Sequence, residues 1–252
     1  MTEKDDLVVT TYAERPEYVP RVYDMDDAWP RFMGHDKVAN ALLWRVVETF
    51  PQLCSVATLD GRPVARARAA PFAQHAQGRD GTLPDGGWDT VMMWAFDDHA
   101  DGVPTDTVTA LEVAIDPAHQ GRGLSTRMLG AMRQAATAAG FRELVAPVRP
   151  NEKHREPHTP TAEYAARTRP DGLPADAWLR VHVRAGATIE SVAPTSMTIA
   201  GSLAEWRDWT GLPFATSGPV EVPEALVPVH CDLEQDHAVY VEPNVWVRHR
   251  LR

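Results

Sequence analysis

The stretch from Leu111 to Leu129 constrains the fold of this chain more than any other part of the sequence. An apolar, strand-like run ends there at an Asp–Pro step, and a helical pattern starts a few residues later. The residues that join the two are Gln120, Gly121, Arg122 and Gly123. Two glycines at such a junction allow a tight turn and leave the backbone amides uncovered by side chains. The first helical turn adds unpaired N–H groups and a positive dipole end, so the segment predicts a site for a phosphorylated ligand.

Two common phosphate-binding motifs do not match this segment. A dinucleotide fingerprint needs a third glycine, but position 126 is Thr. A Walker loop needs Gly-Lys-Ser/Thr, which is absent. The segment is therefore a different kind of phosphate cradle.

The cradle resembles motif A of the GNAT superfamily of N-acetyltransferases, Q/R-x-x-G-x-G/A, with Gln120, Gly123 and Ser125 at the matching positions. Ser125 is a departure, because the family prefers Gly or Ala there. In that family the loop amides hold the coenzyme A pyrophosphate, and the preceding strand pairs with the pantetheine arm. The resemblance assigns coenzyme binding to Val113, Ile115, Gln120, Gly121, Arg122, Gly123, Leu124, Ser125, Thr126 and Asn151.

The pattern of predicted elements agrees with the resemblance. We expect helices over 37–50, 88–99, 126–139 and 175–185, and strands over 53–59, 63–70, 108–115, 143–148, 187–192 and 196–200. Asp60–Gly61 predicts a hairpin between the first two of these strands. This order is that of a GNAT core, so we expect an α/β (α+β) fold with a mixed, mostly antiparallel sheet flanked by helices.

The predicted core covers residues 1–200, with an insertion at 151–177, and a C-terminal extension covers residues 201–252. For the extension we expect a helix over 203–209 and strands over 226–233 and 238–247, packed on the core. The extension is a possible homodimer interface.

Acyl transfer needs an amine that loses its proton and a thiolate that gains one. In many relatives a Tyr in the pattern Tyr-x-x-x-Gly-Phe faces the coenzyme sulfur, and the resemblance places His182 at that position. An imidazole near its reference pKa of about 6.5 can donate a proton at neutral pH. The alternative is a packed histidine with both nitrogens satisfied.

Glu112 is the candidate base, on the strand that leads into the cradle. Alternation along the strand places it on the face opposite Val113, where it could meet the amine pocket. The alternative is a solvated carboxylate. Many relatives need no strong base.

The insertion is long and polar, and its position directly after the predicted acyl-transfer notch suggests a lid for the acceptor. Its arginines, at 155, 167 and 169, with Arg149 just before it, either attract an acidic acceptor or balance nearby carboxylates. The spacings His154-x-Glu156-x-His158 and His230–His237 match no metal motif, so we expect no metal.

Composition limits the remaining classes. The formal net charge of −10 disfavours nucleic-acid binding, and the longest apolar run, 91–96, is too short to span a membrane. Two cysteines form no disulfide framework, and the start MTEKDDLVV shows no signal pattern. We expect a cytoplasmic protein.

The resemblance thus implies an N-acyltransferase that moves an acyl group, expected to be acetyl, from acetyl-CoA to an amine of a small molecule. One alternative is a GNAT-fold enzyme of specialised metabolism that takes its acyl group from aminoacyl-tRNA or a carrier protein. Another is a non-catalytic ligand-binding module of the same fold.

Overall fold

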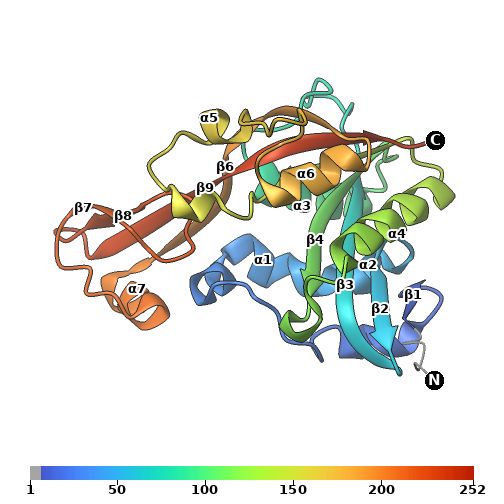
Figure 1. The fold of residues 1–252 in the computed structure, drawn as a ribbon, viewed down its shortest axis with the longest axis horizontal. Helices are drawn as coiled ribbons and strands as arrows, with labels where there is room; N and C mark the ends of the chain where they lie inside the picture. The colour runs from blue at the N-terminus through green and yellow to red at the C-terminus, as the bar shows by residue number, and fades with distance from the viewer. Residues whose placement is uncertain (1–6) are drawn as a thin grey trace.

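A computed structural model describes residues 7–252, so the first six residues of the amino-terminal stretch lie outside the description. Nine strands form one sheet, in the order β1-β2-β3-β4-β5-β9-β8-β7, and β6 pairs with the other edge of β9 (Figure 1). The strands are β1 (Val8–Thr11), β2 (Ser55–Leu59), β3 (Arg62–Phe72), β4 (Thr107–Ile115), β5 (Glu143–Val148), β6 (Thr188–Ser202), β7 (Gly218–Val220), β8 (Val229–Asp232) and β9 (His237–Arg250). Within the described residues β4 and β5 are the one parallel pair, which confirms the predicted mixed, mostly antiparallel sheet.

Helices cover the sheet on both sides (Figure 1). They are α1 (Lys37–Leu42), α2 (Val46–Thr49), α3 (Gly87–Asp101), α4 (Leu124–Ala138), α5 (Thr161–Ala165), α6 (Ala177–Arg184) and α7 (Leu203–Thr210). The apolar stripe of α4, from Leu124 through Met128 to Met132, is buried in the main core. Helix α3 packs against β3, β6 and β9 and also contacts α1.

The helix predicted over 37–50 is broken into α1, a 3-10 turn (Leu43–Arg45) and α2. The carbonyl of Leu43 accepts a hydrogen bond from the buried Arg68 guanidinium, 3.1 Å away. The amide of Val46 also turns back to this carbonyl, which closes a 3-10 turn instead of an α-helical one.

The two strands predicted at 187–192 and 196–200 form one long strand, β6. Its register against β9 shifts where Ala193 faces Asn244 and Met197 faces Glu242, so the residues between them bulge. The bulge brings Ser196 to the start of α3, where its hydroxyl accepts from the Trp88 amide at 2.8 Å. A side chain on Gly87 would collide with the Ser196 hydroxyl, so this close approach requires glycine.

The C-terminal segment contributes an interior strand to the sheet as well as an appendage. The whole of β5 pairs with the C-terminal part of β9, from Glu143 opposite Arg250 to Val148 opposite Val245. The N-terminal part of β9 extends beyond β5 towards α7, where it pairs with β6 on one edge and with β8 on the other (Figure 1). A second apolar cluster there joins Phe32 and Met33 to Trp206 and Tyr240. The chain segment before α1 is thus held by residues from the C-terminal end.

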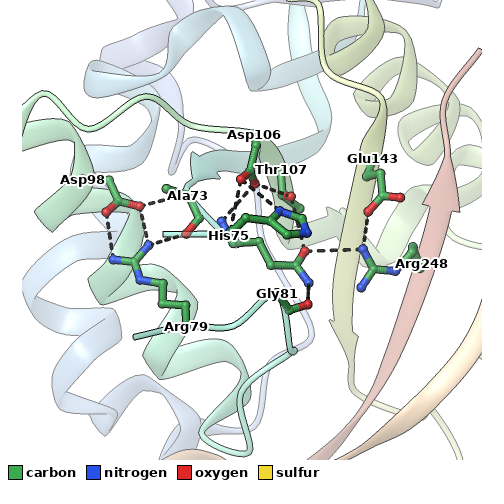
Figure 2. A network of polar contacts seen from close by, with 10 residues as sticks. Ala73, His75, Arg79, Gly81, Asp98, Asp106, Thr107, Glu143 and Arg248 are labelled. Atoms are coloured by element: carbon green, nitrogen blue, oxygen red, sulfur yellow. Dashed lines mark hydrogen bonds and ion pairs between the residues drawn. The ribbon is translucent and has the colours of Figure 1, made fainter. Parts of the chain in front are cut away.

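One end of the β4–β5 pair is tied together by a polar network (Figure 2). Asp106 accepts from the Thr107 hydroxyl at 2.7 Å and from the amide of Gln74 at 2.9 Å. Arg248 on β9 forms an ion pair with Glu143 at the start of β5. On α3, the carboxylate of Asp98 receives two hydrogen bonds from Arg79, at 2.6 and 2.8 Å. We call this region the closed end of the β4–β5 pair.

No helix among residues 7–252 is both long and apolar enough to cross a lipid bilayer.

Candidate active site

Strands β4 and β5 separate soon after they begin. They pair only at Val108 with Leu144 and at Thr109 with Val145. Beyond these residues β4 continues along β3, whereas β5 continues along β9. Within the described chain, the backbone edge of residues 110–115 that faces β5 therefore has no strand partner, and a notch opens between the two strands. We call this region the open end of the pair.

A bulge in β4 lies at the start of the notch. Ala110 faces Ala69 and Glu112 faces Arg68, so Leu111 has no partner on β3. The indole N–H of Trp88 donates to the Leu111 carbonyl at 2.8 Å. This bond satisfies a backbone group that the bulge takes out of the ladder. The first turn of α3 is thereby fixed beside the notch.

The predicted cradle follows β4 directly and has the open form that phosphate binding needs. Gly121 and Gly123 have φ of +75° and +74°, a conformation that favours glycine, and a Cβ on either would meet nothing within 4 Å in the described chain. Among the residues that the structure describes, the amides of Gly121, Gly123, Leu124, Ser125 and Thr126 donate to no protein acceptor, and no side chain caps the start of α4. These amides are free to bind an anion.

The other residues assigned to the coenzyme lie on β4, in the loop itself and just beyond β5. Val113 and Ile115 lie half-buried on β4, while Gln120 and Arg122 are exposed in the loop. The Gln120 side-chain amide is 3.5 Å from the Ile115 carbonyl. Asn151 is exposed just beyond β5, at the mouth of the notch.

Glu112, the predicted base, lies buried in an ion cluster. Its Oε2 is 2.9 Å from Nε of Arg66 and 3.0 Å from Nε of Arg68. Burial alone would raise its pKa, but the Arg68 and Arg66 charges hold the pKa below its usual value. A carboxylate held in this way has little affinity for a proton at neutral pH. The contacts favour an ion-pair role for Glu112, and its role as a base stays a prediction.

His182, the predicted acid, is 2% exposed. Its Nδ1 lies 2.9 Å from Nε2 of His249, which faces Leu144 at the closed end. Burial, followed by the neighbouring His249, lowers the pKa of His182 to about 3. The imidazole is therefore neutral at physiological pH, and these contacts favour packing. Its role as a proton donor stays a prediction.

A group of carboxylates that the sequence analysis did not identify lies close to the notch. Asp36 caps α1, Asp89 is in the first turn of α3, and Glu242 is on β9. Burial, followed by the charge of Asp36, raises the pKa of Asp89 to about 8. Burial also raises the pKa of Asp36. The sequence could have identified Asp36 as a helix N-cap, because an Asp directly precedes the predicted helix. That residues 36, 89 and 242 lie close together depends on the tertiary fold.

The insertion is anchored to the rest of the chain. Lys153 is fully buried, and its ammonium donates to the carbonyls of Glu156 and Leu226, both at 2.8 Å. Burial lowers the pKa of this lysine. The arginines of the insertion pair with nearby acids: Arg155 with Glu152, Arg167 with Glu156 and Glu163, and Arg169 with Asp171. These pairs agree with the charge-balancing interpretation rather than with attraction of an acidic acceptor.

Within residues 7–252, no group of three or more His, Cys, Asp or Glu side chains is spaced to hold a metal ion.

Comparison with known proteins places the chain in a family. The model of the acetyltransferase (GNAT) family matches residues 19–156. The chain is 32% identical to the arginine N-acetyltransferase avaD of Aspergillus versicolor, over 96% of this chain and 93% of that protein.

Two solved structures share the fold. They are the loading GNATL domain of CurA from Lyngbya majuscula (TM-score 0.61, 18% identity, 97% of both chains) and the GNAT-like decarboxylase GphF with isobutyryl-CoA (TM-score 0.58, 20% identity, 98% and 99% of the chains). The family match, the relative that is similar over nearly its full length and the shared fold all agree with the open cradle and with the separation of β4 from β5. The chain belongs to the acetyltransferase (GNAT) family and is an N-acyltransferase.

Proposed function

We propose that this enzyme transfers the acetyl group of acetyl-CoA to a nitrogen of arginine or of a small molecule that contains arginine. The proposed identity of the acceptor rests on the 32% identity to an arginine N-acetyltransferase over nearly the full length of both chains. The donor is supported by the open cradle at the start of α4.

In the proposed complex, the amides of residues 121–126 bind the pyrophosphate of the coenzyme, flanked by Gln120 and Asn151. The unpaired edge of β4 around Val113 and Ile115 accepts the pantetheine arm as an added strand. Such an arm would aim the thioester into the notch.

The reaction proposed is direct. The neutral acceptor nitrogen attacks the thioester carbonyl carbon, a C–N bond forms and the C–S bond breaks. The nitrogen loses one proton and the departing thiolate takes up one, so the products are the N-acetylated acceptor and free coenzyme A. Holding the two reactants about 3–3.5 Å apart supplies much of the rate enhancement.

The experiment is an assay of free-thiol release with acetyl-CoA and a panel of amines, with mass spectrometry of the product. We expect one equivalent of acetylated arginine, or of an arginine-containing acceptor, for each thiol released. Thiol release with other amines but with no arginine compound would contradict the proposed acceptor. Thermal-shift comparison of acetyl-CoA with longer acyl-CoAs and with aminoacyl-tRNA tests the donor, and stabilisation by tRNA alone would contradict it.

A further inference from the structure

Two carboxylates from distant parts of the chain approach one backbone amide beside the notch. The Thr198 amide donates to Oδ2 of Asp89 at 3.1 Å, and the same amide contributes to the pKa of Asp36. Glu242 is close enough for its charge to raise the pKa of both aspartates. Three acidic side chains therefore share one small region.

The charges in this region are unequally compensated. Glu242 receives hydrogen bonds from Arg149 at 2.9 Å, from the Tyr240 hydroxyl at 2.8 Å and from the Asn244 side-chain amide at 3.0 Å. By contrast, within residues 7–252 neither Asp36 nor Asp89 forms an ion pair.

Each aspartate also keeps an oxygen without a donor. Asp36 is 0% exposed, and its Oδ1 accepts from the Ala39 amide at 2.7 Å. Its Oδ2 and the Oδ1 of Asp89 are buried with no hydrogen-bond partner in the described chain. Leaving such atoms unpaired costs free energy in general. Because the pKa of Asp89 is raised to about 8, its carboxyl holds a proton at neutral pH in the free protein, and a cationic ligand with N–H donors would displace this proton and pair both oxygens.

The carboxylates lie next to residues that border the open end of the notch. Asp89 follows Trp88, whose indole contacts the β4 bulge at the start of the notch. Glu242 lies on β9 beyond Val245, the residue that pairs with the last residue of β5. The group therefore lies beside the open end, on β9 and next to Thr198 of β6.

The positions of both aspartates are fixed by packing. Gly87 contacts Ser196 closely, which locks the start of α3 against β6. Just before Asp36, His35 stacks on Trp209 with ring centroids 4.2 Å apart, and Phe32 packs edge-on against Tyr240. The C-terminal segment thus helps to hold Asp36 in place.

We propose that Asp36 and Asp89, backed by Glu242, bind the cationic guanidinium of the acceptor and so orient it towards the notch. This inference rests on the proposed function for the acceptor's identity. A guanidinium is planar and carries five N–H donors, so it can serve two carboxylates at once. A metal ion fits less well, because no such group among the described residues has metal-binding spacing.

Asp36→Asn and Asp89→Asn, alone and combined, test the proposal. Asn remains a good helix cap at position 36 and can still accept from Thr198 at position 89, so both variants should fold. Asp97→Asn is the matched control, because Asp97 is exposed on the same helix as Asp89. The readouts are the KM for acetyl-CoA and the KM for arginine against citrulline, its neutral isostere.

We expect the double variant to raise the KM for arginine at least about tenfold, in line with the loss of a buried charge partner. The KM for acetyl-CoA should not change, and Asp97→Asn should match the wild type. An arginine KM that is unchanged in a folded double variant would overturn the proposal.

A binding measurement separates this inference from the proposed function. Calorimetry with arginine and citrulline, in the presence of coenzyme A, needs no turnover. If the wild type binds arginine but does not acetylate it, and the double variant loses that binding, the guanidinium site stands and the proposed reaction fails. If arginine binds the wild type and the double variant equally, or binds neither, the guanidinium site is overturned.

Discussion

At the closed end of the β4–β5 pair, polar groups from the loop after β3 and from α3, β5 and β9 are paired with one another, as Asp98 with Arg79 and Glu143 with Arg248. At the open end the strands separate, and among residues 7–252 the cradle glycine amides have no protein acceptor while Asp36 and Asp89 keep unpaired oxygens. The same sheet therefore carries a region whose charged side chains are paired and a region that keeps unpaired aspartate oxygens and free loop amides. We therefore assign stability to the closed end and ligand binding to the open end. Variants at the closed end should mainly change stability, and variants at the open end should mainly change binding.

The largest expected effect is on stability, at the closed end. Asp98→Ala would leave the guanidinium of Arg79 and the amide of Ala73 without their shared carboxylate. Loss of one partner of a buried ion pair should lower the free energy of unfolding by about 3 kcal/mol. Chemical denaturation measures this change, with the exposed neighbour Asp97→Ala as control. An affinity for acetyl-CoA that falls while stability is unchanged would reverse our assignment of the closed end.

The next effect is on coenzyme affinity, at the open end. Gly123 and Gly140 lie at opposite ends of α4, both have positive φ, and a methyl group on either would meet no atom of the described chain within 4 Å. Alanine should strain either site by a similar amount, about 1–2 kcal/mol. Only Gly123→Ala should also weaken acetyl-CoA binding, by about tenfold, which corresponds to about 1.4 kcal/mol. Calorimetry of both variants checks this, and equal affinities would contradict the cradle.

A smaller effect concerns Asp89 and pH. Its pKa in the folded state is raised to about 8 by burial and by Asp36 and Glu242, so the folded protein retains a proton that the unfolded chain releases. Stability contributed by this group is therefore greatest in acid and falls as pH rises to about 8. Asp89→Asn removes the dependence and should be more stable than wild type, by about 1 kcal/mol at pH 8.

Thermal unfolding of wild type and Asp89→Asn between pH 5 and 8 follows this difference. The gap between the two melting temperatures should widen as pH rises. A constant gap would show that Asp89 is not under strain from its neighbours.

The smallest expected effect is an absence of pH dependence at His182. Because its pKa is lowered to about 3, the imidazole stays neutral from pH 5 to 8. The ratio of kcat/KM between wild type and His182→Gln should therefore be constant over this range. A ratio that changes with a midpoint near 6.5 would restore His182 as the proton donor.

The contrast between the ends also explains what the sequence could predict. The cradle, the β2–β3 hairpin and strand β5 are local, and their turn residues and periodicity identify them. The position of β9 between β5 and β6 depends on pairing across the whole chain, so the sequence suggested only a packed extension.

Charged residues in the interior were similarly hard to foresee. Arg66 and Arg68 alternate with alanines in β3, a pattern that normally marks a solvent-facing side, yet both are buried around Glu112. The state of Asp36 and Asp89 depends on which cationic side chains the fold brings near them, which no local pattern records.

The most direct test of the central claim is amide hydrogen exchange across residues 121–126, with and without acetyl-CoA. We predict marked protection of these amides on binding, because the coenzyme's pyrophosphate becomes their acceptor. Saturating acetyl-CoA that leaves their exchange unchanged, while it protects amides elsewhere, would contradict the account.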